Sequence, residues 1–363
     1  MQKSRFLKAA TIQGLVFRTP GPGTGRHDPA MIPASPLPAQ PAPDWRRQWR
    51  ESITDPAELL RLLELPAGLA SEAAATRFRL RVTRAWLARI RPGDPHDPLL
   101  RQVLPLDAEG RVEPGYGADA VGDLAARIAP GLLRKYAGRA LLVATGSCAI
   151  HCRYCFRREF PYAAETAARD RWQAAVAALA ADPSIHELIL SGGDPWSLDT
   201  PRLVELTRAL REVPHLRRLR VHTRLPVVLP ARVDRPLLDW LGRLPWPVTV
   251  VIHANHAREI DAAVATACAD LRRAGATLLN QSVLLCGVND DAAVLCDLSE
   301  RLHEAGVLPY YLHQLDRVTG TAHHAVRDRT ARALHATMRA RLPGYLVPRL
   351  VREIAGAAAK TPL

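Results

Sequence analysis

The sequence predicts an α/β protein: a partial, TIM-like (β/α)6 barrel with parallel strands, preceded by a small helical domain. From residue 140 onward, short apolar runs such as "ALLVATG" and "HELILSGG" alternate with amphipathic segments such as "TPRLVELTRALREV". About six such repeats predict a parallel sheet, because parallel strands need helical crossovers. A second observation concerns polar residues that follow the apolar runs: Cys148, Asp194, Arg224, His253, Gln281 and Asp316. We therefore expect a site at the carboxyl ends of the strands, where barrel-like folds carry their chemistry.

Composition divides the chain into four predicted parts. Pro, Gly and Ala are abundant over residues 19–44, which predicts a disordered lead-in over 1–44. Residues 45–135 have a helical pattern, since "DPAELLRLLELP" starts with Asp-Pro and repeats leucine, and "SEAAATRFRLRVTRAWLARI" continues in the same manner. The barrel is expected over residues 136–345, followed by a C-terminal segment over 346–363.

Overall composition limits the class of protein. The chain has 363 residues, of which 48% are hydrophobic, so it can bury a sizeable core. It has no apolar stretch long enough for a membrane span and no apolar core of a signal peptide. The net charge is +13, but the basic residues are scattered and few aromatics lie among them, which disfavours a nucleic-acid partner. Six unevenly spaced cysteines do not suggest a disulfide scaffold and favour a reducing cytoplasm.

Three of the cysteines form the stretch "CAIHCRYCF", with Cys148, Cys152 and Cys155 at the spacing C-x3-C-x2-C. Structural zinc takes four ligands, and His151 could be the fourth, so a zinc site is one interpretation. A [4Fe–4S] cluster usually takes four thiolates, so three would leave one iron open to bind a substrate or cofactor.

A glycine pair in "SGGDP" follows the second apolar run. Gly192 and Gly193 would let the backbone approach a ligand closely, where any Cβ would clash. The alternative is an ordinary tight turn from strand to helix, with Asp194 as the N-cap of that helix.

Together, the cysteine and glycine motifs resemble the radical S-adenosylmethionine (SAM) superfamily from about residue 140 onward. The resemblance implies a [4Fe–4S] cluster on the three cysteines and SAM on its open iron. It also implies that Gly192, Gly193 and Asp194 contact the methionine amino group, and that His253 and Gln281 are further SAM contacts.

Longer stretches resemble the lysine 2,3-aminomutases: "KYAGRALLVATGSCAIHCRYCFRREF", "HTRLPVVLPARV", "NQSVLLCGVNDD", "PYYLHQLD" and "GYLVPRLVREIAGAAAKTPL". This resemblance implies isomerisation of L-α-lysine to (R)-β-lysine with pyridoxal phosphate. The chemistry requires a lysine that can form an imine, which an always protonated arginine cannot do. The family keeps that lysine at the position of Lys360, although a lysine near a C-terminus is by default a solvated residue.

The same resemblance implies roles for five more residues. Arg157 would clamp the substrate carboxylate, because a guanidinium suits a planar, bidentate partner. Asp316 and Glu353 would hold the distal ammonium of lysine. Tyr136 and Arg139 would help to seat pyridoxal phosphate.

The stretch "CFRREFPY" and the end of the chain at Leu363 resemble the EpmB subgroup, which makes (R)-β-lysine for elongation factor P. The product would pass to a separate ligase. Stand-alone aminomutases have Asp and "PGGGGK" where this chain has Glu353 and "IAGAAAK", and relatives carry a basic residue at Cys286. Alternatives are a metabolic lysine aminomutase, an aminomutase for another amino acid such as glutamate, and an RNA-modifying radical enzyme. Two acidic residues disfavour glutamate, and an RNA-modifying enzyme would have no use for Lys360.

Overall fold

The computed structural model describes residues 44–170 and 172–363. The lead-in predicted over residues 1–44 lies outside them, apart from Asp44. All the described residues belong to one compact unit, so the division of this unit at residues 135 and 345 stays a prediction.

The described residues contain strands, α-helices and short 3-10 helices in the following order. The strands are β1 (Arg127–Ala129), β2 (Leu132–Tyr136), β3 (Arg139–Thr145), β4 (Glu187–Gly192), β5 (Arg218–Thr223), β6 (Val248–His253), β7 (Thr277–Leu284), β8 (Leu308–Gln314), β9 (Arg349–Arg352) and β10 (Thr361–Pro362). The α-helices are α1 (Trp45–Arg50), α2 (Pro56–Leu62), α3 (Glu72–Arg77), α4 (Arg84–Leu87), α5 (Gln173–Ala181), α6 (Thr200–Leu210), α7 (Leu225–Val228), α8 (Arg235–Gly242), α9 (Ala262–Arg273), α10 (Ala292–Glu304) and α11 (Asp328–Arg341). The 3-10 helices are η1 (Ala67–Leu69), η2 (Asp107–Gly110), η3 (Ala167–Asp170), η4 (Pro195–Ser197), η5 (Pro230–Arg232), η6 (Ala257–Glu259), η7 (Ala322–His324) and η8 (Gly344–Leu346).

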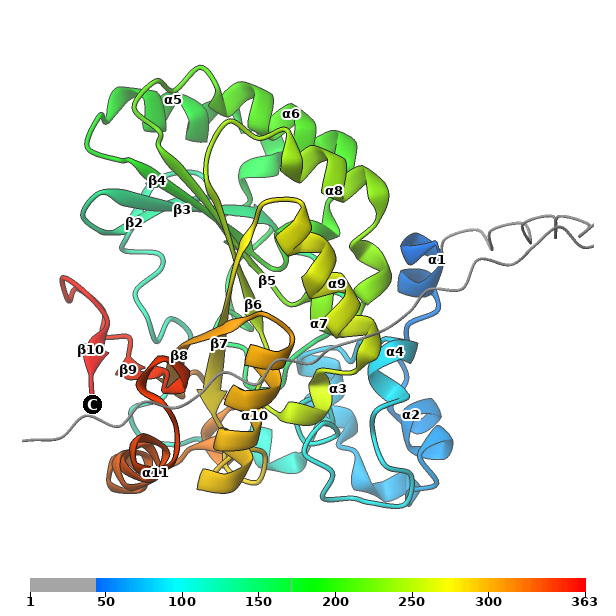
Figure 1. Cartoon of the computed structure of the whole chain (residues 1–363). Helices are drawn as coiled ribbons and strands as arrows, with labels where there is room; N and C mark the ends of the chain where they lie inside the picture. The colour runs from blue at the N-terminus through cyan, green and yellow to red at the C-terminus, as the bar shows by residue number, and fades with distance from the viewer. Residues whose placement is uncertain (1–43, 171) are drawn as a thin grey trace, which may run out of the picture. The chain divides into compact units, whose positions relative to one another are not determined.

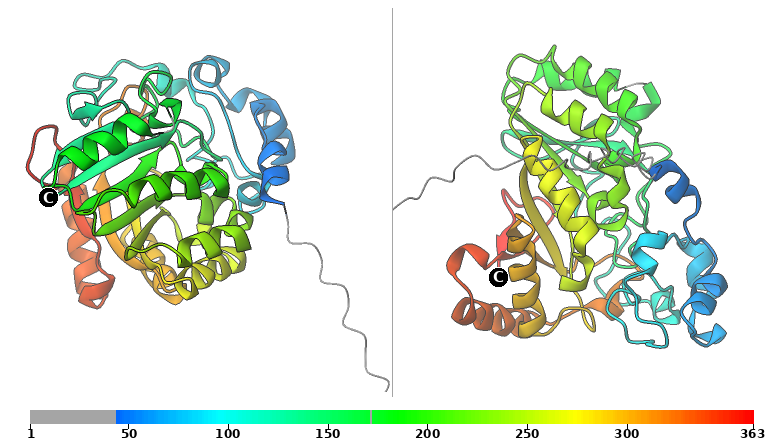
Figure 2. Two further views of the ribbon diagram at one scale, coloured as in Figure 1. Left: turned by 90° about the horizontal axis from the view of Figure 1, so that it is seen from above. Right: turned by 45° about the vertical axis from the view of Figure 1, so that its right-hand side comes forward.

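The strands form one sheet in which their spatial order follows the chain. Strands β3 to β9 are parallel, whereas β1, β2 and β10 pair antiparallel at the two edges. Because β1 and β10 do not pair with each other, the barrel is open. The sheet curves, and the crossover helices lie along its outer side (Figures 1 and 2). The predicted partial barrel of six β/α units is confirmed, with β3 to β8 as its strands.

Local sequence explains where the crossover helices begin. In four of them an aspartate side chain accepts a hydrogen bond from a backbone N–H of the first turn, which satisfies a donor that has no partner inside the helix. These N-caps of α6, α8, α9 and α10 are Asp199, Asp234, Asp261 and Asp291. Strand β4 is buried along almost its whole length, as expected for a parallel strand with both faces covered.

The N-terminal segment, expected to be a small helical domain, is helical only in short pieces. It contains the short α-helices α1 to α4 and the 3-10 helices η1 and η2, and residues near 127–136 form β1 and β2. In "FRLRV", the buried Leu80 and Val82 alternate with arginines, which is the period of an extended strand, and Val82 pairs with Ile53. Thr83 then starts α4 afresh by capping it through the backbone N–H of Trp86. This segment shares one hydrophobic cluster with the barrel strands.

The C-terminal segment also differs from the expected six-stranded arrangement. Strand β9 pairs with β8 and adds a seventh parallel strand, and β10 turns back to pair with β9. The last residues are therefore part of the sheet rather than a free tail.

Candidate active site

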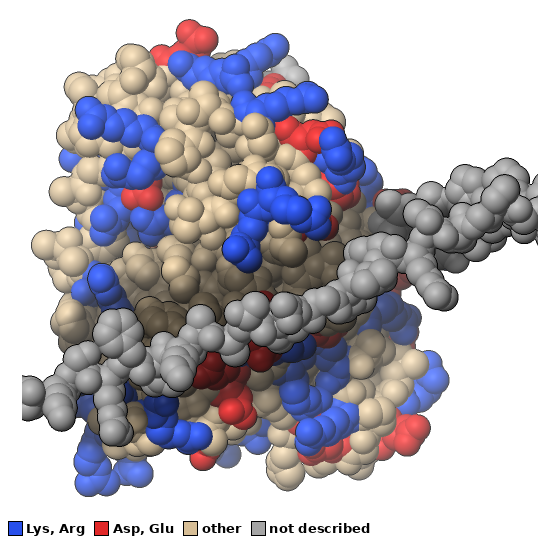
Figure 3. Space-filling view, in the orientation of Figure 1, with Lys and Arg blue, Asp and Glu red and all other residues tan. Residues whose placement is uncertain are grey.

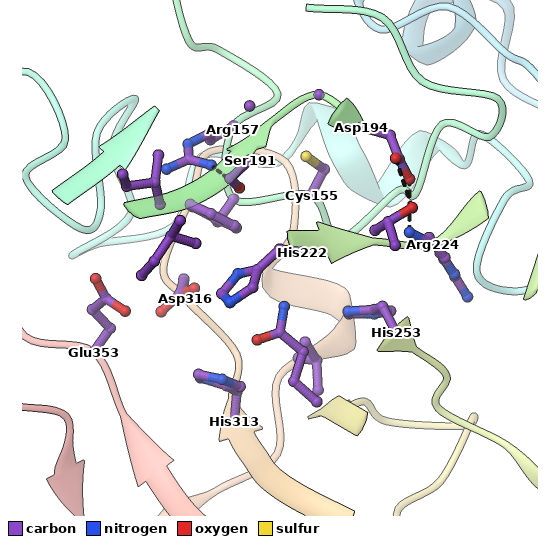
Figure 4. Close-up of a pocket in the computed structure, with 18 of the residues that line it drawn as sticks. Cys155, Arg157, Ser191, Asp194, His222, Arg224, His253, His313, Asp316 and Glu353 are labelled. Atoms are coloured by element: carbon purple, nitrogen blue, oxygen red, sulfur yellow. Dashed lines mark hydrogen bonds between the residues drawn. The ribbon is translucent and has the colours of Figure 1, made fainter. Parts of the chain in front are cut away.

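A cavity of about 500 Å³ opens at the carboxyl ends of the strands. Figure 4 shows side chains from several strands and from the cysteine loop facing it. All the site residues predicted from the sequence line this one cavity: Tyr136, Arg139, Cys148, Cys152, Cys155, Arg157, Gly192, Gly193, Asp194, His253, Gln281, Asp316, Glu353 and Lys360.

The cysteines lie in the loop after β3. All three thiols are free, and the turn between two of them is closed by a bond of 3.0 Å from the Cys155 N–H to the Cys152 carbonyl. Arg224 Nη1 donates to Cys152 Sγ at 2.7 Å. Burial raises the pKa of the Cys148 and Cys155 thiols, which keeps them protonated. A metal cation bound to the sulfurs would favour loss of these protons. Three free thiols on one cavity suit an iron–sulfur cluster.

The zinc interpretation finds no support in this part of the chain. Across residues 44–170 and 172–363, no three His, Cys, Asp or Glu side chains are grouped to hold a metal ion. His151, the proposed fourth ligand, shares a hydrogen bond of 2.7 Å with the Arg79 carbonyl and stacks on Phe78 instead of lining the cavity. A four-iron cluster is wider than a single ion, so its ligands need not approach one another so closely.

The structure gives a reason for both glycines that is separate from the predicted close approach of a ligand. A Cβ on Gly192, whose φ is +116°, would lie 2.5 Å from the Thr145 carbonyl oxygen. A Cβ on Gly193 would lie 2.5 Å from the Ser147 carbonyl oxygen. The glycines are thus required because the end of β4 packs against the loop that carries the cysteines. Close approach of a ligand to their backbone stays a prediction.

Asp194 has the N-cap role that was the alternative interpretation. Its carboxylate accepts hydrogen bonds from the N–H groups of Trp196, Arg224 and Leu225 and from the Thr223 hydroxyl. These bonds join the ends of β4 and β5. Burial nevertheless raises the pKa of Asp194.

Arg157 is held by groups on the cavity wall. Its Nε donates to Asp123 Oδ2 at 2.6 Å. Its Nη1 donates to Ser191 Oγ at 3.2 Å (Figure 4). Asp123 is 1% exposed and also pairs with the ammonium of Lys135 at 2.6 Å. The guanidinium is therefore fixed in place while its other N–H groups remain available to an anionic ligand.

The acidic side of the cavity contains one paired and one unpaired carboxylate. Glu353 accepts from Lys135 Nζ at 2.9 Å and from Lys360 Nζ. Burial alone would raise the pKa of Glu353, but the two ammonium groups outweigh it and lower that pKa to about 2. Among the described residues, the Asp316 carboxylate has no hydrogen-bond or ion-pair partner, and burial and then the charge of Glu353 raise its pKa to about 7.

The sheet carries Lys360 into the cavity. It directly precedes β10, whose Thr361 is paired with Arg352 of β9, and this pairing fixes the lysine opposite Glu353. Its Nζ lies 5.7 Å from the centre of the Tyr311 ring.

Tyr136 and Arg139 lie together on the hairpin of β2 and β3, with the guanidinium 4.6 Å from the centre of the tyrosine ring. On the other side, His253 and Gln281 are in register on β6 and β7. His253 Nε2 shares a hydrogen bond of 2.9 Å with the Tyr154 hydroxyl.

The polar residues of this cavity that sequence reasoning missed include Asp123, Lys135, His222 and His313. Lys135 adjoins Tyr136, and His222 opens the quoted stretch "HTRLPVVLPARV", so both could have been noticed. Asp123 lies in a segment that was expected to be helical, and nothing in its neighbourhood of the sequence marks it.

On the outer surface, the face in Figure 3 has its lysines and arginines in several separate groups rather than in one patch. None of the helices in the described ranges has both the length and the apolar character that a membrane crossing requires.

Comparisons with known proteins identify similar chains. Residues 137–219 match a family model described as a 4Fe-4S single cluster domain. The chain is 47% identical over 323 residues to the L-lysine 2,3-aminomutase of Escherichia coli (strain K12), covering 88% of this chain and 94% of that protein. It is 42% identical to the enzyme of the same name from Haemophilus influenzae, covering 90% and 98%.

A more distant relative, the L-lysine 2,3-aminomutase of Clostridium subterminale, is 33% identical over 88% of this chain and 77% of that protein. Among solved structures, a radical SAM methyltransferase from Sphaerobacter thermophilus covers 61% of this chain and 68% of its own, with a TM-score of 0.42 and 19% identity. That structural likeness is too slight to bear on the assignment.

Proposed function

Because the chain belongs to the L-lysine 2,3-aminomutase family, we propose that it converts L-α-lysine into (R)-β-lysine for the β-lysylation of elongation factor P. Membership makes the protein a radical SAM isomerase, with a [4Fe–4S] cluster, SAM and pyridoxal phosphate as its cofactors. The direction of the reaction, the residue roles and the cellular use of the product are our proposal.

The observation that carries the proposal is the convergence of three chemical groups on one cavity. The cysteine loop, the Lys360 ammonium and the Arg157 guanidinium come from distant parts of the chain and all line the same 500 Å³. When bound, the cluster supplies the electron that cleaves SAM, and pyridoxal phosphate holds the migrating nitrogen. This chain's part is to hold the amino acid between them and to keep water out.

Arg157 and Asp316 would fix the two ends of lysine. The Arg157 guanidinium, held by Asp123 and Ser191, presents its remaining N–H groups to the substrate carboxylate. Asp316 has no partner in the described part of the chain and faces the cavity, so a ligand ammonium would supply the cation that its carboxylate lacks. A glutamate side chain would instead bring a third negative charge to Asp316 and Glu353, which opposes glutamate as substrate.

Lys360 would form the imine with pyridoxal phosphate, with Tyr136 and Arg139 beside the cofactor. SAM would bind the cluster on the side of Gly192, Gly193, His253 and Gln281. In the absence of cofactor, the ion pair with Glu353 holds the Lys360 ammonium at the cavity wall.

An anaerobic assay tests this function directly. The reconstituted protein with SAM, a reductant, pyridoxal phosphate and L-α-lysine should release β-lysine, identified by chiral chromatography. Lys360→Ala should abolish the product and Lys8→Ala, outside the described residues, should serve as the matched control. Absence of β-lysine from protein with full iron, sulfide and pyridoxal content would rule the proposal out.

The link to elongation factor P rests on the resemblance of "CFRREFPY" to that subgroup and on the free thiols, which suit a reducing cytoplasm. The product would then be handed to a separate ligase. The second candidate is a metabolic lysine aminomutase. Mass spectrometry of elongation factor P from a deletion strain separates them: loss of β-lysine, restored by supplied (R)-β-lysine, supports the first, and an unchanged factor supports the second.

A further inference from the structure

Two histidines of the cavity have no role in the site described above. His222 lies on β5 and His313 on β8, so they reach the cavity from different walls. Figure 4 shows His222 in the middle of the cavity, between Asp316 on one side and His253 on the other, with His313 approaching from β8.

Neither imidazole has a hydrogen-bond partner among the described residues. The His222 Nε2 is buried and unpartnered, and the polar contacts of His313 amount to a ring contact with Tyr311, 5.4 Å between centroids. His313 is only 9% exposed. Buried polar atoms in folded proteins nearly always have a partner, so the His222 ring calls for one that is a ligand or water, and the His313 ring faces the same cavity.

Both rings are held in the neutral state by their surroundings. Burial lowers the pKa of His222, and the cations Arg220, Lys360 and Arg157 lower it further. Burial and then Lys360 lower the pKa of His313 to about 3, against a small opposing effect of Glu353. A neutral imidazole has one donor and one acceptor nitrogen, so each ring can bind polar atoms without adding charge.

The location of the rings limits the ligand. The Tyr311 ring lies 5.7 Å from Lys360 Nζ and 5.4 Å, between centroids, from the His313 ring, and His222 lines the same cavity, so a group that joins Lys360 enters the space that these rings face. Under the proposed function, that group is pyridoxal phosphate, whose aromatic ring carries a phenolic oxygen and a pyridine nitrogen. The phosphate is an anion and suits the guanidinium of Arg139 rather than a neutral ring.

We propose that His222 and His313 bind the polar ring atoms of pyridoxal phosphate and hold its ring between Lys360 and the cysteine loop. This inference rests on the proposed function, because it assumes that pyridoxal phosphate joins Lys360. It adds two uncharged contacts to the charged groups that also line the cavity.

Equilibrium dialysis of the reconstituted full-length protein against pyridoxal phosphate tests the proposal without any turnover. His222→Phe and His313→Phe should each weaken binding about tenfold, because they leave a ligand atom without its hydrogen bond. His222→Asn and His313→Gln restore a neutral donor and acceptor and should regain most of the affinity. His303→Phe, on the exposed face of α10, is the matched control and should bind like the wild type.

The outcomes separate this inference from the proposed function. Wild-type affinity in both folded Phe variants means that the rings bind only water and overturns the inference, while the proposed function stands. Failure of folded Asn and Gln variants to regain affinity also overturns it, because hydrogen bonding would not be what the rings supply. If Lys360→Ala binds as well as the wild type, the proposed function itself fails.

Discussion

Replacing Asp316 by asparagine should stabilise the folded protein while it destroys lysine turnover. The pKa of Asp316 rises from 3.8 to about 7, chiefly through burial and secondly through the charge of Glu353. At 1.36 kcal/mol per pH unit, that rise corresponds to about 4 kcal/mol of unfavourable free energy when the carboxylate is charged in the folded state. The asparagine side chain is neutral and nearly isosteric with aspartate, so the substitution removes this cost.

The sign of the effect follows from proton linkage. Between pH 3.8 and about 7 the folded protein binds a proton at Asp316 that the unfolded chain has released, so Asp316 lowers stability as pH rises through this window. At pH 4.5 the folded wild type is protonated, and the variant should unfold at nearly the same temperature. At pH 8 the variant should have the higher midpoint.

Lysine turnover should change in the opposite direction. The Asp316 carboxylate is the unpaired acidic group of the cavity, and removing the partner of a buried cation costs about 3–5 kcal/mol. That corresponds to a loss of roughly a hundredfold or more in kcat/KM for lysine. Cleavage of SAM without lysine should persist, because SAM would bind on the side of Gly193 and His253 and is not assigned to Asp316.

Asp328→Asn is a control that should change the stability in the opposite direction, because the pKa of Asp328 is lowered. Its carboxylate accepts two hydrogen bonds from Arg352, which lower its pKa. Asp328→Asn should therefore destabilise the protein at pH 8 and leave its stability at low pH almost unchanged. Thermal unfolding at both pH values and lysine kinetics at pH 8 decide the matter. Unchanged stability of Asp316→Asn at pH 8 would contradict the raised pKa of Asp316. Normal lysine kinetics would mean that the distal ammonium site lies elsewhere.

Three further predictions concern the rest of the cavity. Cys155→Ala should remove the cluster and all cleavage of SAM, whereas Cys268→Ala, at a buried position on α9, should keep both. Iron and sulfide analysis measures the cluster, and an intact cluster in Cys155→Ala would contradict the prediction. Lys135→Met leaves the buried Asp123 with one cation fewer and should cost about 3 kcal/mol of unfolding free energy in urea, more than Lys135→Arg. Gly193→Ala should lower the iron content at reconstitution, because its Cβ would meet the Ser147 carbonyl at 2.5 Å; wild-type iron content would show that the loop can move.

The barrel could be predicted from the sequence in more detail than the N-terminal segment, and the difference has physical reasons. Apolar runs and amphipathic helices of the barrel repeat, and an aspartate caps several of the helices, so pattern and local signals agree. In residues 45–135, alanine and leucine suggested helix, but the alternation around Leu80 and Val82 and the contacts of Thr83 with the barrel determined the structure. Tertiary contacts outweigh helix propensity there.

The site divides in the same way. The cysteine loop and the glycine pair are short motifs of the local chain, so their spacing and the resemblance that it carries could point to them. Asp123 and Lys135 were not, since their significance comes from partners far away in the chain. Asp123 binds Arg157 and Lys135, and Lys135 reaches Glu353, which binds Lys360.

This series of ion pairs has a consequence for the proposed reaction. It joins the guanidinium expected to hold the substrate carboxylate to the lysine expected to hold the cofactor, through alternating negative and positive groups. A change of charge at Lys360 would thus alter the partners that remain for Glu353. While pyridoxal phosphate held the Lys360 nitrogen, Glu353 would keep only Lys135 as its cation and would be available, beside Asp316, to the ammonium of an incoming lysine. Cofactor loading would then strengthen lysine binding, and lysine affinity measured with and without pyridoxal phosphate checks it; equal affinities would contradict this coupling.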